Sequence, residues 1–151
     1  MKKKVKCYIA AGWFNPQQEA DLTKIEEILE ARSWVEVASP RKIFICPPNA
    51  SKDVQDSTFV GNLEHIKTSD FVIMSSLGKD AGALFEVGYS YANNVPIVYI
   101  CVGLPEGAKF NLMLSRSGRK VCTTYEQLED YLDRSRVAGQ LLDEPYADSI
   151  E

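Results

Sequence analysis

The run VPIVYICV at residues 95–102 limits the fold more than any other part of the sequence. It is apolar on both faces, which is typical of a central strand in a parallel sheet that helices cover on both sides. Other apolar runs also predict strands, and stretches with helical spacing of their apolar residues lie between them. Strands that alternate with helices in this way predict a parallel α/β sheet.

The expected elements follow one another at the spacing of βα units. Strands are predicted at 4–10, 42–46, 70–74, 95–102 and 120–123, with a further fragment at 34–37. Helices are predicted at 17–31, at 54–67 with Phe59, Val60, Leu63 and Ile66 inward, after the third strand as far as residue 94, briefly at 110–114, and at 124–134. Five strands favour a flavodoxin-like, doubly wound parallel sheet, and the length favours a single domain over residues 1–151.

Composition excludes several classes of function. The 151 residues carry a formal charge of −4, which argues against a nucleic acid polymer as partner. No apolar run approaches the roughly 20 residues that span a bilayer, so we expect no membrane association. The basic start, MKKKVKCYIA, leads straight into Gly12 and predicts a first strand instead of a signal peptide.

The four cysteines do not form a metal-binding pattern. No two are spaced as CxxC, and the only histidine, His65, is distant from all of them in sequence. We therefore expect no metal site, and we expect buried free thiols in a reducing cytoplasm. The turn after the first strand lacks G-x-G-x-x-G, and the chain lacks G-x-x-x-x-G-K-[ST], so no cofactor is predicted and nicotinamide and ATP chemistry are disfavoured.

Polar and aromatic side chains gather where the strands of such a sheet end. The loops at the carboxyl edge would bring together an aromatic wall, two carboxylates, a phenol and an amide, which suits a flat, neutral ligand with hydroxyl groups. Glu86 lies in the most apolar part of its helix, where an unpaired carboxylate costs free energy unless it has a function. A cap at Asp80 with a solvated glutamate is the alternative. The residues concerned are Tyr8, Trp13, Phe14, Asp80, Glu86, Asn111 and Met113.

The ordered set of motifs resembles the nucleoside 2-deoxyribosyltransferase family. The matching pieces are YIAAGWF at 8–14, IKTSD at 66–70, DAGALFEVGYS at 80–90 and NLM at 111–113. They cover about residues 7–114, and the pattern D-x-G-x-x-x-E-x-G-Y is the most specific of them. The resemblance implies a flavodoxin-like fold, 2′-deoxynucleosides and free nucleobases as substrates, and a homo-oligomer.

The resemblance also implies roles for individual residues. Glu86 matches the nucleophile that attacks C1′ and forms a covalent deoxyribosyl-enzyme, so that transfer to a second base proceeds with retention. Tyr8 matches the phenol that orients this nucleophile, and Asp80 matches an aspartate that holds sugar hydroxyls or relays protons. Gly12, Trp13 and Phe14 match the segment around the base. Asn111 and Met113 match residues that a neighbouring subunit lends to close the site.

One position departs from the family. Asn62 stands where many relatives carry an aspartate that helps to protonate and recognise the leaving base. An asparagine can form hydrogen bonds but cannot supply a proton. Another group or water must therefore protonate the base, or the base preference differs.

Two other functions compete with transfer. A 2′-deoxynucleoside 5′-monophosphate N-glycosidase would share the glutamate, pass the sugar to water and bind a phosphate through serines and basic groups. Residues available for this are Ser75, Ser76, Ser115, Arg116, Ser117 and Arg119. A non-catalytic nucleotide-binding module is the second alternative, because a fold does not fix a function.

Overall fold

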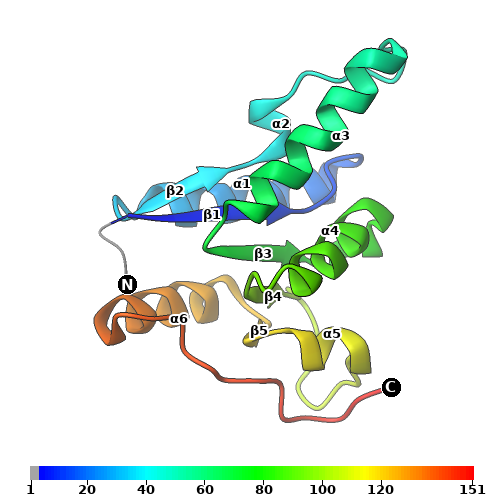
Figure 1. Ribbon diagram of the computed structural model, residues 1–151. Coiled ribbons are helices and arrows are strands. Elements are labelled where there is room, and N and C mark those ends of the chain that lie inside the picture. Colours follow the sequence, from blue (N-terminus) through cyan, green and yellow to red (C-terminus); the bar gives the residue numbers. More distant parts are fainter. Residues whose placement is uncertain (1–3) are drawn as a thin grey trace.

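The computed structural model describes residues 4–151 and consists of one parallel sheet between two layers of helices (Figure 1). The strand order is β2-β1-β3-β4-β5, and all four pairings are parallel. This confirms the predicted flavodoxin-like sheet. The strands are β1 (Val5–Ala10), β2 (Val35–Ala38), β3 (Phe71–Ser75), β4 (Ile97–Ile100) and β5 (Lys120–Cys122), and the helices are α1 (Pro16–Glu30), α2 (Pro40–Ile43), α3 (Lys52–Lys67), α4 (Ala81–Ala92), α5 (Leu112–Ser117) and α6 (Tyr125–Ala138), with the 3₁₀ turn η1 (Leu77–Lys79).

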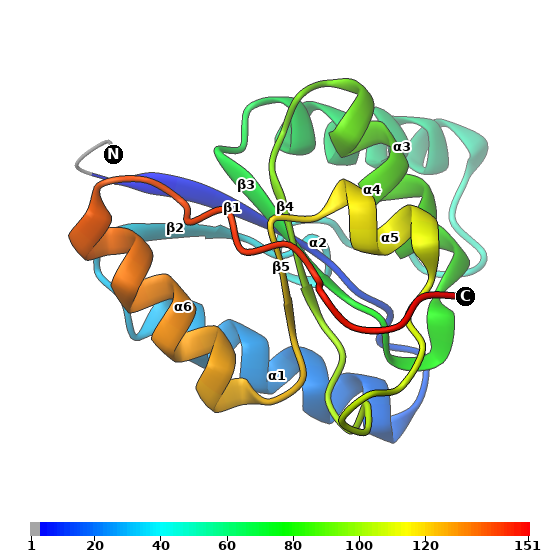
Figure 2. The ribbon, with the colours of Figure 1, turned by 90° about the horizontal axis from the view of Figure 1, so that it is seen from below.

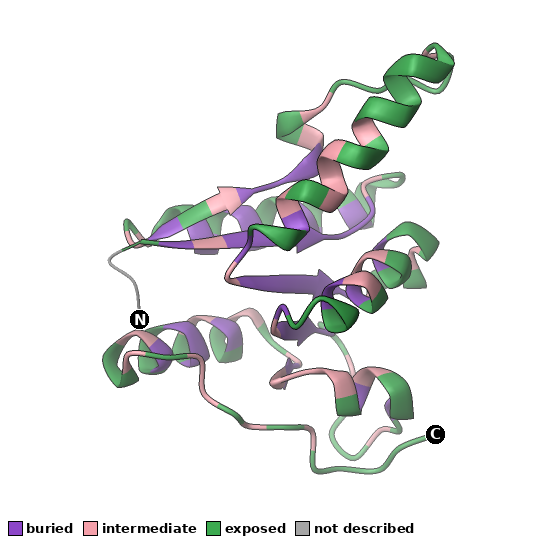
Figure 3. Cartoon of the chain, in the orientation of Figure 1, coloured by how far each residue is buried: buried purple, intermediate pink, exposed green. Residues whose placement is uncertain are grey.

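The two helical layers cover opposite faces of the sheet. Helices α1 and α6 lie side by side on one face, and α3, α4 and α5 lie on the other (Figure 2). Strands β3 and β4 are buried along their whole length, as their apolar sequences predict (Figure 3). Alternate residues of β1 enter different cores: Cys7 and Ile9 face α1, whereas Tyr8 and Ala10 face α4.

Local sequence signals set the starts of the helices that matter for the site. Asn15 caps α1 by accepting from the Gln18 N–H at 2.9 Å, and Pro16 occupies the first helical position. Asp80 caps α4 by accepting from the Ala83 N–H at 2.9 Å. Asn111 caps α5 by accepting from the Leu114 N–H at 3.2 Å. The loops that follow β1, β3 and β4 therefore each lead into a capped helix start.

The prediction of a second strand at 42–46 was wrong. The second strand is β2, which overlaps the predicted fragment at 34–37, and the first two residues of the predicted strand belong to the short helix α2. Pro40 favours a helix start because it lacks an N–H and has a fixed φ. The buried Glu26 of α1 then fixes this turn through Arg41 at 2.7 Å and Lys42 at 3.1 Å. Ile45, in the middle of the predicted strand, is 91% exposed.

Helix α3 is less buried than its pattern predicts. Ile66 is buried and Leu63 is partly buried, but Phe59 and Val60 are exposed. The first half of α3 extends beyond the sheet edge, so no strand lies beneath it (Figures 1 and 3).

The prediction that all four cysteines are buried was wrong for one of them. Cys7, Cys101 and Cys122 are buried free thiols, whereas Cys46 is exposed in the loop between α2 and α3.

Gly118 allows α5 to lie close to the sheet. A Cβ at this position would lie 2.6 Å from the ring of Tyr99, which is fully buried in β4. Gly118→Ala is therefore expected to destabilise the fold by about 1–3 kcal/mol through overpacking. Urea unfolding would measure this, with Gly88→Ala as control, because a Cβ at Gly88 meets nothing within 4 Å. Equal stability of the two variants would contradict the packing argument.

Among residues 4–151, no helix is long and apolar enough to cross a membrane.

Candidate active site

The site is built around a carboxylate and a phenol that lie far apart in sequence. Tyr8 is fully buried in β1, and Glu86 lies partly buried on α4, which crosses β1 and β3. The Tyr8 hydroxyl donates a hydrogen bond to Glu86 Oε2. This bond fixes one carboxylate oxygen and leaves Oε1 for other chemistry.

Burial dominates the electrostatics of this pair. It raises the pKa of Glu86 to about 7, although the hydrogen bond from Tyr8 acts to lower it, and the charge of Asp80 adds to the increase. Burial also raises the pKa of Tyr8 far above its ordinary value, and the Glu86 charge adds to this increase. The phenol therefore stays protonated as a donor, while the carboxylate titrates near neutral pH.

Asp80 lies beside the pair at the start of α4. Its Oδ2 serves the helix cap, so the capping interpretation is correct, but its Oδ1 is turned towards the loop after β1. A Cβ on Gly12 would lie 3.1 Å from that oxygen. Gly12 therefore lets the loop after β1 approach the Asp80 carboxylate closely.

Trp13 and Asn62 share a cavity of about 310 Å³ next to this loop. Trp13 stacks on the exposed Phe14 with ring centroids 5.2 Å apart. Asn62 Oδ1 is buried and has no hydrogen-bond partner among the described residues. An aromatic wall and an unpaired amide oxygen suit a flat heterocycle. Sequence reasoning missed the rest of the lining, Pro40, Arg41, Phe44, Ile45, Cys46, Pro47 and Thr58, because it placed residues 42–46 in a strand.

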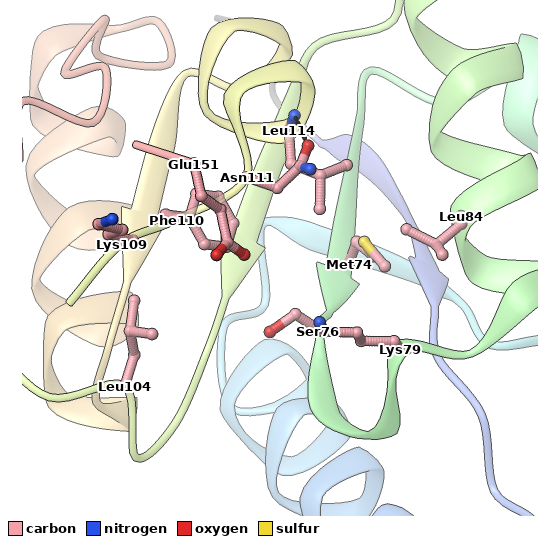
Figure 4. Close-up of a pocket in the computed structure, with 10 residues that line it drawn as sticks. All are labelled: Met74, Ser76, Lys79, Leu84, Leu104, Lys109, Phe110, Asn111, Leu114 and Glu151. Carbon is pink, nitrogen blue, oxygen red and sulfur yellow. Dashed lines mark hydrogen bonds between the residues drawn. The ribbon is translucent and has the colours of Figure 1, made fainter. Parts of the chain in front are cut away.

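Asn111 and Met113 do not meet Glu86 within one chain. Asn111 lines a cavity of about 370 Å³ together with Leu84 of α4 and Glu151 (Figure 4). Leu84 and Glu86 are separated by about 200° around the helix, so this cavity and the Tyr8–Glu86 pair lie on different flanks of α4. Met113 is 74% exposed. The structure thus brings Tyr8, Asp80 and Glu86 together, whereas Asn111 lines a cavity on the other flank of α4 and Met113 is exposed.

The residues available for a phosphate are dispersed. Ser75 donates to Asp21, and Ser115 donates to the Leu112 carbonyl at 2.9 Å. Ser117 is paired with the Tyr99 hydroxyl at 2.7 Å. Arg116 lies beside α4, whereas Arg119 lies with Val5, Phe71 and Pro96 at the amino end of the strands, and only Ser76 lines the cavity of Asn111. These side chains do not form one pocket.

Over residues 4–151, no group of three or more histidine, cysteine, aspartate or glutamate side chains is arranged to hold a metal ion.

A partly buried carboxylate near the carboxyl edge of a parallel sheet can act as a nucleophile at an acetal-like carbon. Comparison with known proteins identifies the family. The chain belongs to the nucleoside 2-deoxyribosyltransferase family, whose model matches residues 7–114. This confirms the resemblance and supports a deoxyribosyltransferase type of function, with nucleosides and nucleobases as the substrates that the family implies. No curated protein matches the sequence significantly.

Solved structures agree with the family assignment. A 2-deoxyribosyltransferase from Bacillus psychrosaccharolyticus is 27% identical with a TM-score of 0.79, and the match covers 94% of this chain and 99% of that one. A conserved protein from Enterococcus faecalis shares the fold at 16% identity, with a TM-score of 0.69 and coverage of 87% and 98%. A CMP N-glycosidase from Clostridium botulinum shares it at 14% identity, with a TM-score of 0.58 and coverage of 85% and 98%.

Proposed function

We propose that the protein transfers the 2-deoxyribosyl group between nucleobases through a covalent bond to Glu86, with retention at C1′. The observation that supports this most directly is the Tyr8–Glu86 hydrogen bond in a buried setting. Glu86 Oε1 attacks C1′ as the bond to the first base breaks, and the base leaves with the electron pair of that bond. A second base then attacks C1′, the C1′–Oε1 bond breaks, and two inversions give net retention.

The other residues have supporting roles in the proposal. Asp80 holds a sugar hydroxyl or relays a proton through Oδ1. Gly12, Trp13, Phe14 and Asn62 accommodate the base in the cavity that Trp13 and Asn62 share. The setting is nucleoside salvage in a reducing cytoplasm, in which the free thiols of the protein are stable.

A base-exchange assay tests the proposed function. The protein is incubated with deoxyinosine or thymidine plus free adenine or cytosine, and the products are separated chromatographically. A new deoxynucleoside supports transfer. Release of the base alone, and only from a 5′-monophosphate, would establish the N-glycosidase alternative instead.

Two residues at the start of α5 support a shared site, because within their own chain Asn111 lines a different cavity and Met113 is exposed. We propose a homo-oligomer in which Asn111 and Met113 of one subunit complete the Glu86 site of its neighbour. Glu86→Gln and Asn111→Ala are each expected to be inactive alone. Mixing them with subunit exchange should restore activity, because a hybrid site would combine Glu86 from one subunit with Asn111 from the other. Absence of recovery in a proven hetero-oligomer would contradict sharing.

Asn62 is expected to limit proton transfer to the leaving base. Asn62→Asp introduces an acid beside the base cavity, and general acid catalysis contributes about 10²-fold or more when a proton is well placed. We therefore expect faster exchange at low pH, most clearly for donors whose bases leave poorly. Steady-state rates from pH 5 to 8 would measure this, with Asn62→Ala as the control that removes the amide without adding an acid. A slower Asn62→Asp enzyme at every pH would show that the proton comes from elsewhere.

A further inference from the structure

Gln18 is a buried polar residue that the proposed chemistry does not use. It lies on α1, on the opposite face of the sheet from α4, and is 7% exposed. Its Oε1 accepts a hydrogen bond from the Phe14 N–H at 2.9 Å, and its Nε2 donates to the Leu77 carbonyl at 3.5 Å. One amide therefore connects the loop after β1 to the turn after β3.

Two glycines allow both segments to approach this amide. A Cβ on Gly12 would lie 2.8 Å from Gln18 Oε1, and a Cβ on Gly78 would lie 2.6 Å from Gln18 Nε2. Gly78 also has a φ of 74°, a conformation that favours glycine. The Gln18 amide thus fills the space that side chains at Gly12 and Gly78 would need.

Asp21 lies three residues after Gln18 on α1 and also helps to hold the turn after β3. This buried carboxylate accepts hydrogen bonds from the hydroxyls of Ser75 and Tyr125, the latter at 2.5 Å. The Ser75 oxygen in turn accepts from the Leu77 N–H at 3.2 Å. Both the N–H and the carbonyl of Leu77 are therefore held by side chains that α1 anchors.

We propose that Gln18, with Asp21 behind it, is a positioning residue for the carboxylates of the active site. The turn that it holds, η1, leads directly into Asp80. Asp80 caps α4, the helix that carries Glu86. Gly12 lies between the Gln18 amide and Asp80 Oδ1, because a Cβ at this position would come close to both. The catalytic part of this inference rests on the proposed function. We call these contacts of Gln18 and Asp21 the clamp. A displacement of about 1 Å in reacting groups costs up to about 10²-fold in rate, so loss of the clamp should lower the rate of the reaction measurably.

The test compares Gln18→Met with Gln127→Met. Methionine keeps the volume of glutamine and removes its hydrogen bonds. Gln127 is a matched control, because its Oε1 accepts from the N–H four residues before it, at Thr123, as Gln18 does from Phe14. Hydrogen–deuterium exchange of the folded proteins follows residues 12–14 and 77–80, and base-exchange kinetics give kcat and KM separately.

The clamp predicts faster hydrogen exchange in both segments of Gln18→Met and a loss of kcat of about tenfold or more, with KM changed less than about threefold. Gln18→Glu keeps the acceptor for Phe14 and should restore slow exchange at residues 12–14 but not at 77–80. Gln127→Met should leave both readouts at the wild-type level. Unchanged exchange in Gln18→Met would overturn the clamp, and a wild-type kcat in that variant would overturn its role in catalysis.

Failure of this inference can be told apart from failure of the proposed function. If the wild type makes no new nucleoside, the proposed function fails, and hydrogen exchange alone decides whether Gln18 holds the two segments. If the wild type is active and Glu86→Gln is not, a fully active Gln18→Met rejects the positioning role and leaves the proposed function intact.

Discussion

Glu86→Gln is expected to abolish base exchange and, at the same time, to make the folded protein more stable above pH 7. Glutamine keeps the shape of the side chain and can still accept the Tyr8 hydrogen bond, but it cannot form the covalent sugar ester. Loss of a nucleophile of this kind lowers kcat by about 10³-fold or more. The stability gain follows from the burial that raises the pKa of Glu86 to about 7.

The pH dependence of this stability gain follows from the pKa of Glu86 in the unfolded and folded states. In the unfolded chain Glu86 releases its proton near its ordinary pKa of 4.5, whereas in the folded protein it holds the proton until about pH 7. Between these values the folded state binds more protons, so stability falls as pH rises, by about 3 kcal/mol in all. Glu86→Gln removes this loss. Its advantage in the free energy of unfolding should be small below pH 4.5, grow to pH 7 and stay constant above it.

Two measurements check the prediction. Unfolding curves at pH 4.5 and pH 8 would compare wild type, Glu86→Gln and the exposed control Glu27→Gln. Mass spectrometry after incubation with a 2-deoxy-2-fluoro nucleoside should show a sugar adduct on Glu86 in the wild type and none in Glu86→Gln. An active wild type that forms no adduct, or an adduct on another residue, would rule out Glu86 as the nucleophile.

The sequence predicted the sheet well where burial is uniform. Residues 95–102 and 71–74 are apolar throughout, and β4 and β3 lie within or next to these runs. Residues 43–46 are just as apolar, yet they do not form a strand. Their position depends on Glu26, which is far away in sequence and pairs with Arg41 and Lys42. A local pattern cannot report a partner that only the tertiary fold supplies.

The same limit applies to the site. The motif order indicated Tyr8, Asp80 and Glu86, and the sheet register brings these residues together. Gln18 gave no signal, because a glutamine near the start of a charged helix ordinarily faces water. Its burial follows from Gly12 and Gly78, which come from two different loops. Likewise, the exposure of Phe59 and Val60 follows from where α3 crosses the sheet edge, which helical periodicity does not show.

Tyr8→Phe is expected to move the pH dependence of base exchange to higher pH. The Tyr8 hydroxyl favours the ionised form of Glu86, so its removal raises the pKa of that carboxyl above its present value near 7. Less Glu86 is then ionised at pH 7, and the remaining carboxylate is less well oriented. Together these effects should lower kcat/KM at pH 7 by about 10²-fold, the size typical of losing one preorganised donor.

Part of this loss should be recovered on the alkaline side. The acid limb of kcat/KM reports ionisation of Glu86 in the free enzyme. It should lie near pH 7 in the wild type and at higher pH in Tyr8→Phe, so the two activities approach each other as the pH rises. Tyr99→Phe is the matched control: it removes a hydroxyl from another fully buried tyrosine of the same core, but that hydroxyl pairs with Ser117 and not with a carboxylate. It should leave the acid limb in place. Removal of the Tyr8 hydroxyl must raise the pKa of Glu86. An unshifted acid limb in Tyr8→Phe would therefore mean that a group other than Glu86 must be ionised for the reaction.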